Sequence, residues 1–296
     1  MNYLSAEDIR VRLTMETCIG LMRELFVQIG EGKVTHKLRM AMPADSGRLL
    51  GVMPGWLPYK NSIGAKIITV YHDNYKIGLP SHQGIVVIFN TETGAVHGIA
   101  DGMAITAIRT AAVSAVATDA MARRDAGILT LLGAGVQAAS HLKAISLVRS
   151  IKEARVWSID SDEAKEFVLR EAPKHKFPIK AIHAAEEAVA NSDIICTVTS
   201  SKTPVLKGDW VRPGTHINAV GACQPKDREL DSICVAKARL IGDSIESVKN
   251  ESGDFLFPLE EGCFGKEHLL GELGDVLVGR LTARRSNEDI TIFEAL

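Results

Sequence analysis

The spacing of apolar positions predicts that the chain begins with helices. In ETCIGLMRELFVQIGEG the apolar residues recur at helical spacing, and Thr14 precedes the run in the position of an N-cap. Ser5, with Glu7 and Asp8 in the turn that follows, indicates the start of an earlier helix. We therefore expect two helices before residue 35.

Residues 35 to 100 have a pattern typical of β-structure. Gly, Pro and Asn divide this part into short β-rich runs, namely HKLRMAMP, RLLGVMPGWL, GAKIITVYHDN and QGIVVIFNTETGAVHGIA. The segment NTETG has the composition of a hairpin turn. The pattern predicts a mixed or antiparallel sheet.

From about residue 106, helices and strands alternate. The series begins with the alanine-rich helix TAIRTAAVSAVATDAMARR, the strand GILTLLG and the helix AGVQAASHLKAISLV, and it continues to the strands DIICTVTS, GTHINAVGA and ARLIGDS. Such alternation indicates βαβ units and a parallel sheet. Folds of this α/β class bind ligands at the carboxyl ends of their strands.

The segment LTLLGAGVQAASH places Gly133, Gly135 and Ala138 in a G-x-G-x-x-A arrangement between a strand and a helix. In dinucleotide-binding folds the first glycine allows a tight turn and the second lets the backbone approach a pyrophosphate. The third small residue lets helix and strand pack closely. The helix N-terminus adds N–H groups and partial positive charge for phosphates. A plain Gly-rich turn is the alternative, and the βαβ context favours the cofactor site.

The end of the next strand, VWSID, should carry the residue that contacts the ribose. Ser158 stands where an acidic residue often lies, and Asp160 follows two residues later. An acid here favours NAD(H), and an Arg favours NADP(H). Because no Arg or Lys follows directly, the sequence leans to NAD(H). Asp160 is explained equally well as the N-cap of the helix in DSDEAKEF.

Four basic residues in the first part of the chain are candidates for binding an anion. Lys66 lies inside GAKIITV, where alternation points it inward, and burying a Lys is costly unless it meets an anion. Arg39 lies in KLRMAMP, Arg109 lies at the start of the alanine-rich helix beside Thr110, and His82 lies in the PSHQG turn. A small carboxylate substrate would supply the anion. The alternative is an exposed edge lysine and ordinary surface arginines.

Composition excludes several classes of function. Among 296 residues, Lys+Arg number 34 and Asp+Glu 36, so a formal charge of -2 gives no long-range attraction to nucleic acid. No apolar run approaches the roughly 20 residues of a membrane span, and the charged start MNYLSAEDIRVRL does not resemble a secretory signal. Five scattered cysteines predict reduced thiols in the cytoplasm. The nine histidines lack metal-ligand spacing, so no metal is expected.

A series of motifs occurs in order over nearly the whole chain. They are LGVMPGWL, GAKIITVYHDN, LPSHQGIVVIF, DGMAITAIRTAAVSA, LLGAGVQAASH, TVTSSKTPVL, GDWVRPGTHINAVGACQPKDRELD and ESGD. Together they resemble the ornithine cyclodeaminase/mu-crystallin family, and within it the mu-crystallin-like ketimine reductases. The set is far more specific than the glycine loop alone.

The resemblance implies an α/β protein of two domains. Residues 1–112 with 286–296 would form a smaller α+β domain for substrate binding and dimerisation. Residues 113–285 would form a Rossmann domain, with a doubly wound parallel sheet, for NAD(H) or NADP(H). A homodimer is implied, with a cyclic imino acid or an amino acid as the ligand and no nucleic-acid or membrane partner.

The resemblance also implies roles for individual residues. Arg39, Lys66 and Arg109 would lie near the substrate carboxylate and the cofactor phosphates, and Cys223 and Leu296 would face the substrate. Together with the strand-end reasoning above, the expected cofactor contacts are Ser81, Arg109, Thr110, Gly133, Gly135, Val136, Gln137, Ser158, Asp160, Thr199, Asn218, Ala219, Val220 and Gly221.

Position 223 departs from the pattern of ornithine cyclodeaminases. Their segment resembles G-G-D-x-P, in which the Asp transfers a proton and holds the substrate amine, whereas this chain reads GACQP. A free Cys, with a pKa of about 8.5, is mostly neutral at pH 7, so Cys223 reads as a small apolar residue or a pocket-lining thiol. This suits a reductase whose substrate lacks the distal ammonium. The family pattern also continues beyond the segment matching TIFEAL.

We therefore predict NAD(P)H-dependent reduction of Δ1-pyrroline-2-carboxylate or Δ1-piperideine-2-carboxylate to L-proline or L-pipecolate. Arg39 and Lys66 would grip the carboxylate, and Arg109 would bridge substrate and phosphates. Lys66, solvent and a bound water are the candidate proton donors. The alternatives are alanine dehydrogenase activity, ornithine cyclodeaminase activity and a non-catalytic, crystallin-like protein that binds NAD(P)H or another ligand.

Overall fold

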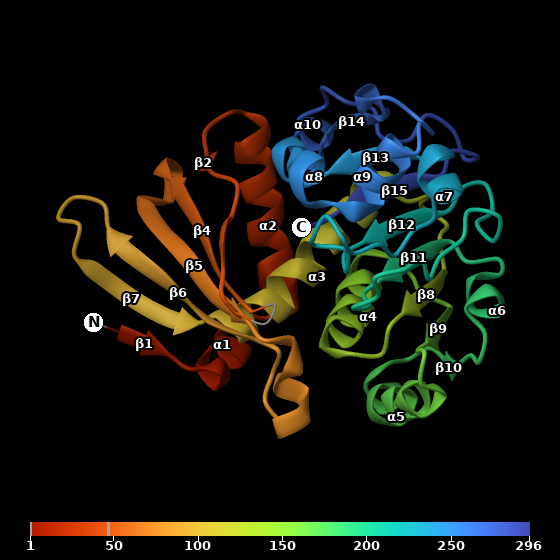
Figure 1. Cartoon of the computed structure of the whole chain (residues 1–296), viewed down its shortest axis with the longest axis horizontal. Helices are drawn as coiled ribbons and strands as arrows, with labels where there is room; N and C mark the ends of the chain where they lie inside the picture. The colour runs from red at the N-terminus through yellow and green to blue at the C-terminus, as the bar shows by residue number, and fades with distance from the viewer. Residues whose placement is uncertain (1, 46–47) are drawn as a thin grey trace. The chain divides into compact units, whose positions relative to one another are not determined.

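The computed structural model describes residues 2–45 and 48–296, except for the side chains of His72 and Tyr75. It divides into two compact units, one extending to Arg109 and the other Thr110–Leu296. Helix α3 (Gly102–Met121) contains the division (Figure 1). Each unit has its own β-sheet.

The first unit is built on a mixed sheet, as the pattern of residues 35 to 100 predicts. Its strands lie in the order β1-β7-β6-β5-β4-β2, and β3 also pairs with β4. β1 is parallel to β7, and all pairs among the strands β2 to β7 are antiparallel. The strands are β1 (Asn2–Leu4), β2 (Thr35–His36), β3 (Met40–Pro43), β4 (Leu49–Leu57), β5 (Ser62–Val70), β6 (His82–Asn90) and β7 (Val96–Asp101).

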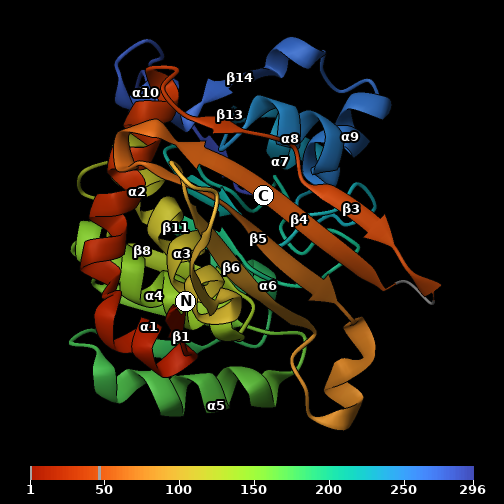
Figure 2. The ribbon, with the colours of Figure 1, turned by 90° about the vertical axis from the view of Figure 1, so that its left-hand side faces the viewer.

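Two helices precede the longer strands of this sheet, and both are confirmed. In α1 (Ala6–Arg12) the Ser5 hydroxyl accepts from the Asp8 N–H at 3.2 Å, and the Asp8 carboxylate accepts from the Ser5 N–H at 2.9 Å. In α2 (Met15–Gly30) Thr14 is the N-cap, as expected. Figures 1 and 2 show α2 on the same side of the sheet as the start of α3.

The second unit has a parallel sheet, which confirms the α/β, Rossmann-type fold. Its strands lie in the order β10-β9-β8-β11-β12-β15-β13-β14. Helices α4 and α6 lie on opposite sides of this sheet (Figure 1). The strands are β8 (Ile128–Leu132), β9 (Glu153–Trp157), β10 (Ile179–Ala181), β11 (Ile194–Thr197), β12 (His216–Ala219), β13 (Arg239–Gly242), β14 (Leu269–Glu272) and β15 (Thr291–Glu294). The helices after α3 are α4 (Val136–Val148), α5 (Ser161–Glu171), α6 (Ala185–Val189), α7 (Ser232–Ala236), α8 (Ile245–Glu251), α9 (Gly253–Glu260) and α10 (Leu273–Leu277).

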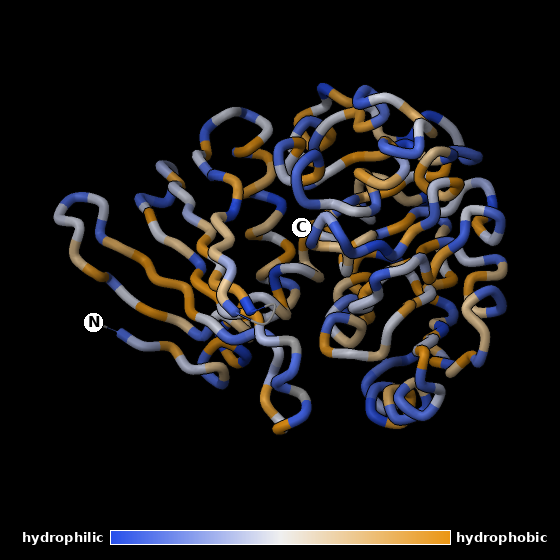
Figure 3. The backbone as a smooth tube through the Cα atoms, viewed as in Figure 1, coloured by the Kyte–Doolittle hydropathy of each residue, from blue (hydrophilic) through white to orange (hydrophobic). Residues whose placement is uncertain are grey.

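The interior of the second unit is formed by the middle strands of the parallel sheet. Every residue of β11, β12 and β15 is buried. Figure 3 shows apolar residues concentrated along the strands of this unit. Helices on both faces of a parallel sheet exclude water from its central strands, which explains their apolar runs. No helix in the described part of the chain has both the length and the apolar character needed to cross a membrane.

Two expectations about chain segments are wrong. Residues 286–296 were expected with the first domain, but they supply β15, which lies between β12 and β13 in the second sheet. The reason is burial, since Ile292 and Phe293 are fully inaccessible there. Arg109 was expected near the start of α3, but the helix begins at Gly102 because the Asp101 carboxylate accepts from the Ala104 N–H at 2.7 Å.

The amino ends of the central strands are held by the carboxylate of Asp193. It accepts hydrogen bonds from the N–H groups of Gly127 at 2.9 Å and Ile128 at 3.0 Å, immediately before and at the start of β8. Arg123 and Arg212 both pair with the same carboxylate. Asp193 directly precedes β11, so a single side chain fixes the starts of two neighbouring strands.

Arg149 closes the C-terminus of α3. Its guanidinium donates to the carbonyl oxygens of Thr118 and Asp119, both at 3.0 Å, and of Ala122 at 3.1 Å. The last carbonyls of a helix have no partner within the helix, so a buried guanidinium satisfies them. Arg149 is only 6% exposed.

We expect Arg149→Met to lower the free energy of unfolding by about 3 kcal/mol, because several carbonyls at the end of α3 lose a hydrogen bond. Arg124→Met is the matched control, since the Arg124 side chain is 85% exposed and pairs with Asp119 at 3.3 Å. Its effect should stay within about 0.5 kcal/mol. Urea unfolding of both variants measures the difference, and equal midpoints would contradict the capping role.

Candidate functional site

The carboxyl ends of the second sheet bring together loops that are far apart in the chain. β8 and β11 are neighbours, with β9 and β10 on one side of them and β12 on the other. Such a reversal of strand order opens a crevice beyond the carboxyl ends, where α/β folds bind ligands. The loops after β8, β9, β11 and β12, together with the first turn of α4 and the end of β12, contain most of the residues predicted to contact a cofactor.

The glycine loop after β8 has the geometry that a dinucleotide requires. Gly133 has φ +117°, and a Cβ atom there would lie 2.8 Å from the carbonyl oxygen of Val198. Gly135 is the N-cap of α4, and a Cβ atom added there would meet no atom within 4 Å. Ala138 is fully buried, so its small side chain lets α4 pack closely. The turn therefore requires a glycine at position 133, whereas the glycine at position 135 leaves open space beside the backbone.

Val136 and Gln137 lie in the first turn of α4, which presents backbone N–H groups and partial positive charge. Val136 is 70% exposed. One turn further, the His141 ring lies 2.8 Å from the Gln137 carbonyl oxygen through Nδ1 and 2.9 Å from the Ser114 hydroxyl through Nε2. Burial lowers the pKa of His141 to about 4, so the ring is neutral at pH 7 and links α4 to α3. The chain at this end of α4 fits a dinucleotide phosphate.

The end of β9 carries a polar pair that the sequence did not reveal. The Ser158 hydroxyl donates to the carboxylate of Glu163 at 2.8 Å. Asp160 accepts from the Asp162 N–H at 2.9 Å and is the N-cap of α5, which confirms the capping interpretation. An acidic group therefore lies next to Ser158, but it is Glu163, one turn into α5. Its contact with Ser158 depends on the path of the helix.

The segment after β12 that was predicted to form the wall near the nicotinamide is mostly buried. Asn218 is inaccessible, and its side-chain amide donates to the Thr118 hydroxyl at 3.0 Å, so it ties β12 to α3. Ala219 is also inaccessible, and Val220 is 6% exposed. Gly221 is partly exposed. Contact between this segment and a cofactor stays a prediction.

Three buried carboxyl groups behind these loops were missed by sequence reasoning. Burial raises the pKa of Glu229, although hydrogen bonds from Thr199 and Gly221 oppose the shift. Burial and the neighbouring Glu229 raise the pKa of Asp254 to about 8. Burial and Asp254 also raise the pKa of Glu294. These acids come from the segments RELD, ESGD and TIFEAL, and no local pattern connects them.

Two residues expected to face the substrate lie at the same edge of the sheet. Cys223 is partly exposed, and its thiol donates to the Val220 carbonyl oxygen at 3.2 Å. Leu296 follows β15, packs against the apolar core of the second unit and donates its N–H to the Asp243 carboxylate at 2.9 Å. Their contact with a substrate stays a prediction.

In the first unit, Lys66 contacts the helix that carries Arg109. The Lys66 ammonium donates to the Thr106 hydroxyl of α3 at 3.2 Å, and Arg109 lies three residues further on the same helix. Arg109 also lies close enough to Cys18 of α2 to act on it electrostatically. Arg39 directly precedes β3, whose first residue, Met40, pairs with Val52 of β4, and Lys66 of β5 pairs with Met53 of the same strand. A place for Arg39 beside Lys66 stays a prediction.

Ser81 and Thr110 stay predicted cofactor contacts. The Ser81 hydroxyl lies 3.0 Å from His82 Nδ1, and its carbonyl accepts from the Tyr71 N–H at 2.7 Å. His82 was expected in a turn, but it begins β6. Thr110 is 8% exposed in the middle of α3. No group of three or more His, Cys, Asp or Glu side chains in the described part of the chain could hold a metal ion.

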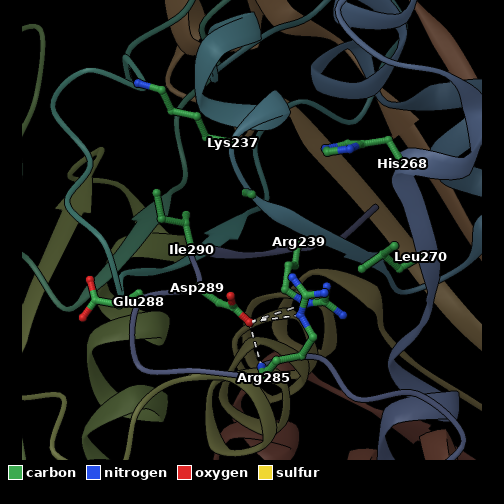
Figure 4. A pocket seen from close by; sticks show the side chains of 9 residues that line it. Lys237, Arg239, His268, Leu270, Arg285, Glu288, Asp289 and Ile290 are labelled. Atoms are coloured by element: carbon green, nitrogen blue, oxygen red, sulfur yellow. Dashed lines mark hydrogen bonds and ion pairs between the residues drawn. The ribbon is translucent and has the colours of Figure 1, made fainter.

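A cavity of about 360 Å³ lies at the opposite edge of the second sheet (Figure 4). Its lining comes from the segments that precede β13, β14 and β15, at their amino ends. Asp289 is one of its lining residues and forms ion pairs with Arg239 and Arg285. None of the predicted cofactor or substrate residues lines it.

The strand reversal and the glycine loop define the second unit as a dinucleotide-binding type of α/β fold. A sequence model of the ornithine cyclodeaminase/mu-crystallin family matches residues 2–296. Ketimine reductase mu-crystallin of Mus musculus is 36% identical over 299 residues, which cover 99% of this chain and 91% of the mouse protein. The chain belongs to the ornithine cyclodeaminase/mu-crystallin family.

Solved structures of other proteins are also similar over the whole chain. The Δ(1)-pyrroline-2-carboxylate reductase of Thermococcus litoralis, in complex with NADH and L-proline, is 37% identical with a TM-score of 0.97, and the match covers 100% of this chain and 92% of that one. An archaeal alanine dehydrogenase dimer with bound NAD is 29% identical with a TM-score of 0.94, and the match covers 100% of this chain and 90% of that one. Both agree with the fold described above.

The two glycines should separate folding from binding. We expect Gly133→Ala to destabilise the protein by about 1–3 kcal/mol, because the new Cβ atom meets Val198 at a positive φ. Gly135→Ala should lower the melting temperature less than Gly133→Ala, since only the N-cap preference of α4 is lost. It should weaken NADH binding about tenfold or more, because its methyl group fills the space left for a pyrophosphate. Thermal unfolding and fluorescence titration with NADH measure the two effects. Unchanged NADH affinity in Gly135→Ala would contradict the predicted approach of the phosphate.

Proposed function

We propose that this chain is an NAD(P)H-dependent imine reductase that converts Δ1-pyrroline-2-carboxylate or Δ1-piperideine-2-carboxylate to L-proline or L-pipecolate. The observation that carries the proposal is the thiol at position 223, where the cyclodeaminase pattern has an Asp. The Cys223 thiol donates to a backbone carbonyl and presents no carboxylate to a substrate amine. Similarity to a reductase described with NADH and L-proline supports the same reaction.

A nicotinamide dinucleotide would supply the hydride when bound. The turn at Gly133 and Gly135 and the first turn of α4 would hold its pyrophosphate, and Ser158 would contact its ribose. The Glu163 carboxylate beside Ser158 supports NAD(H) as the preferred form, because a 2′-phosphate at this position would meet like charge.

The cations of the first unit would bind the substrate carboxylate. Lys66 is held by Thr106, so its ammonium is placed before an anion arrives. Arg39 and Arg109 add guanidinium groups, whose planar donors match a carboxylate in direction as well as in charge. Lys66 or a water beside it would protonate the imine, which accepts hydride more readily in its charged form. A cytoplasmic location stays a prediction from the sequence.

A homodimer forms part of the proposal. The large apolar side chains of the first sheet that are exposed on the face opposite Lys66 include Met40, Met42, Trp56, Ile63 and Ile85. An exposed apolar patch on a strand face is typical of a protein interface. A second copy of the chain would cover it.

The dimer is tested by mass in solution. Wild-type protein should sediment at twice the chain mass of 32.0 kDa. Trp56→Arg should shift the population to monomer, because a buried unpaired charge opposes association. Lys33→Glu, at an exposed position, is the control. A monomeric wild-type protein would contradict this part of the proposal.

The reaction is tested by following NADH and NADPH oxidation with each cyclic imine. Rapid oxidation with an imine, and faster with NADH, is the expected result. Oxidation that requires pyruvate and ammonia would instead show an alanine dehydrogenase, which the similarity to that enzyme makes the first rival. Ammonia release from ornithine without net change in cofactor would show a cyclodeaminase. Tight NADH binding without turnover of any substrate would show a non-catalytic binding protein.

Lys66→Met should lower kcat/KM for the imine about 100-fold, a loss of about 3 kcal/mol in transition-state stabilisation, because one charge-assisted contact is removed. Lys60→Met is the matched control, since Lys60 is an exposed lysine next to the same strand and pairs with Glu24 at 2.8 Å. Steady-state kinetics at saturating NADH measure both variants. Equal kcat/KM for Lys66→Met and wild type would overturn the role of Lys66.

A further inference from the structure

We propose that Glu229 is a positioning residue that sets the shape of the nicotinamide end of the cofactor site, by holding Thr199 and Gly221 in fixed relative places. The inference rests on the proposed function, because it assumes that a nicotinamide dinucleotide binds at the carboxyl ends of β8, β11 and β12. Glu229 itself is fully buried and lies in a loop between β12 and α7.

The side chain of Glu229 connects the ends of two neighbouring strands. One carboxylate oxygen accepts from the Thr199 N–H at 2.6 Å and from the Thr199 hydroxyl at 2.5 Å. The other accepts from the Gly221 N–H at 2.7 Å. Thr199 lies two residues beyond β11, and Gly221 lies two residues beyond β12. A single carboxylate therefore determines the separation of the two loops that follow these strands.

The backbone of Glu229 is fixed from two sides, so the carboxylate has a defined position. Its N–H donates to the Asp254 carboxylate at 2.8 Å, as does the N–H of Leu230. Its carbonyl oxygen accepts from the N–H groups of Val205 at 2.7 Å and Leu206 at 2.9 Å. The position of Glu229 depends on α9, which carries Asp254, and on the chain between β11 and β12.

The fit at Gly221 is too close for any other residue. A Cβ atom added there would lie 2.3 Å from the Thr199 carbonyl oxygen and 2.5 Å from the Glu229 carboxylate. The strand-end residues are therefore packed directly against the carboxylate. A small change in the Glu229 side chain would move the backbone at Gly221, which is the part of the predicted nicotinamide wall that is partly exposed.

The three contacts also require a carboxylate. Each partner is a donor, and an ionised carboxylate is acceptor-only on both oxygens. Glutamine would place an amide N–H₂ against at least one of these donors and would leave a buried N–H group without an acceptor. Glu229→Gln conserves size and shape, so its effect reports the hydrogen bonds.

The test compares NADH with ADP-ribose, which has the pyrophosphate and both riboses but no nicotinamide. Glu229→Gln should weaken NADH binding about tenfold or more and leave the affinity for ADP-ribose within about twofold, because the glycine loop at Gly133 and Gly135 is untouched. The KM for NADH should rise more than the KM for the imine. Glu229→Asp keeps the charge and should restore part of the NADH affinity, which a general loss of stability would not do.

Asp193→Asn is the matched control. Asp193 is also a buried carboxylate that accepts from two backbone N–H groups, but it lies at the amino ends of the same sheet. This variant should melt at a lower temperature and bind NADH and ADP-ribose as the wild type does. A variant that is merely less stable is thus distinguished from one with a displaced site.

Three outcomes would overturn the proposal. Equal NADH affinity in wild type and Glu229→Gln would remove the positioning role and leave the proposed function intact. Equal loss of NADH and ADP-ribose affinity would show a general structural role for Glu229. Wild-type protein that binds neither probe would overturn the dinucleotide site itself, and with it the proposed function. If Glu229→Gln does not fold, the same comparison is made with Glu229→Asp, which should then show the selective loss of NADH affinity.

Discussion

Buried carboxylates that accept backbone N–H groups hold the second unit together at both edges of its sheet. A parallel sheet covered by helices must satisfy every N–H group that leaves a strand, because no water reaches it. The Asp193 carboxylate accepts such N–H groups where β8 and β11 begin, and the Glu229 carboxylate accepts them just beyond the ends of β11 and β12. The arrangement leaves the outer rim of the carboxyl edge free for the glycine loop. The loops predicted to contact a cofactor are therefore held by buried carboxylates that bind their backbone N–H groups.

The sheet of the first unit differs from that of the second, because its two faces have different surroundings. One face lies next to the start of α3, and the other carries exposed apolar side chains. The alternation of a β-strand allows both, since neighbouring residues point to opposite faces. On one face Lys66 contacts Thr106 of α3, three residues before Arg109 on the same helix. On the other face Trp56 and Ile63 are paired across β4 and β5. One strand thus contributes to a predicted anion site and to a predicted subunit interface.

Local signals in the sequence predicted the elements whose cause is local. The caps at Ser5 and Thr14, the turn at Gly133 and the alternation of strands and helices all depend on neighbouring residues, and the structure agrees with them. The sheet to which residues 286–296 belong could not be predicted from local patterns. It is determined by the pairing of β15 with β12 and β13, which are distant from it in the sequence. The contacts of Glu229 and Glu163 were missed for the same reason. Each is a single acid whose partner lies on another element, and only the fold brings the two together.

The position of β15 has a consequence for the order in which the protein can form. This strand follows all others of its sheet in the sequence, yet it lies between β12 and β13 and pairs with both. While the ribosome is still making the chain, β10, β9, β8, β11 and β12 can assemble, but β13 and β14 have no neighbour through which to join them. Until residues 291–294 emerge, β12 and β13 keep unpaired edges, which are templates for association with other chains. Completion of this sheet therefore depends on β15, which is the last of its strands to be synthesised and the one that joins its two parts.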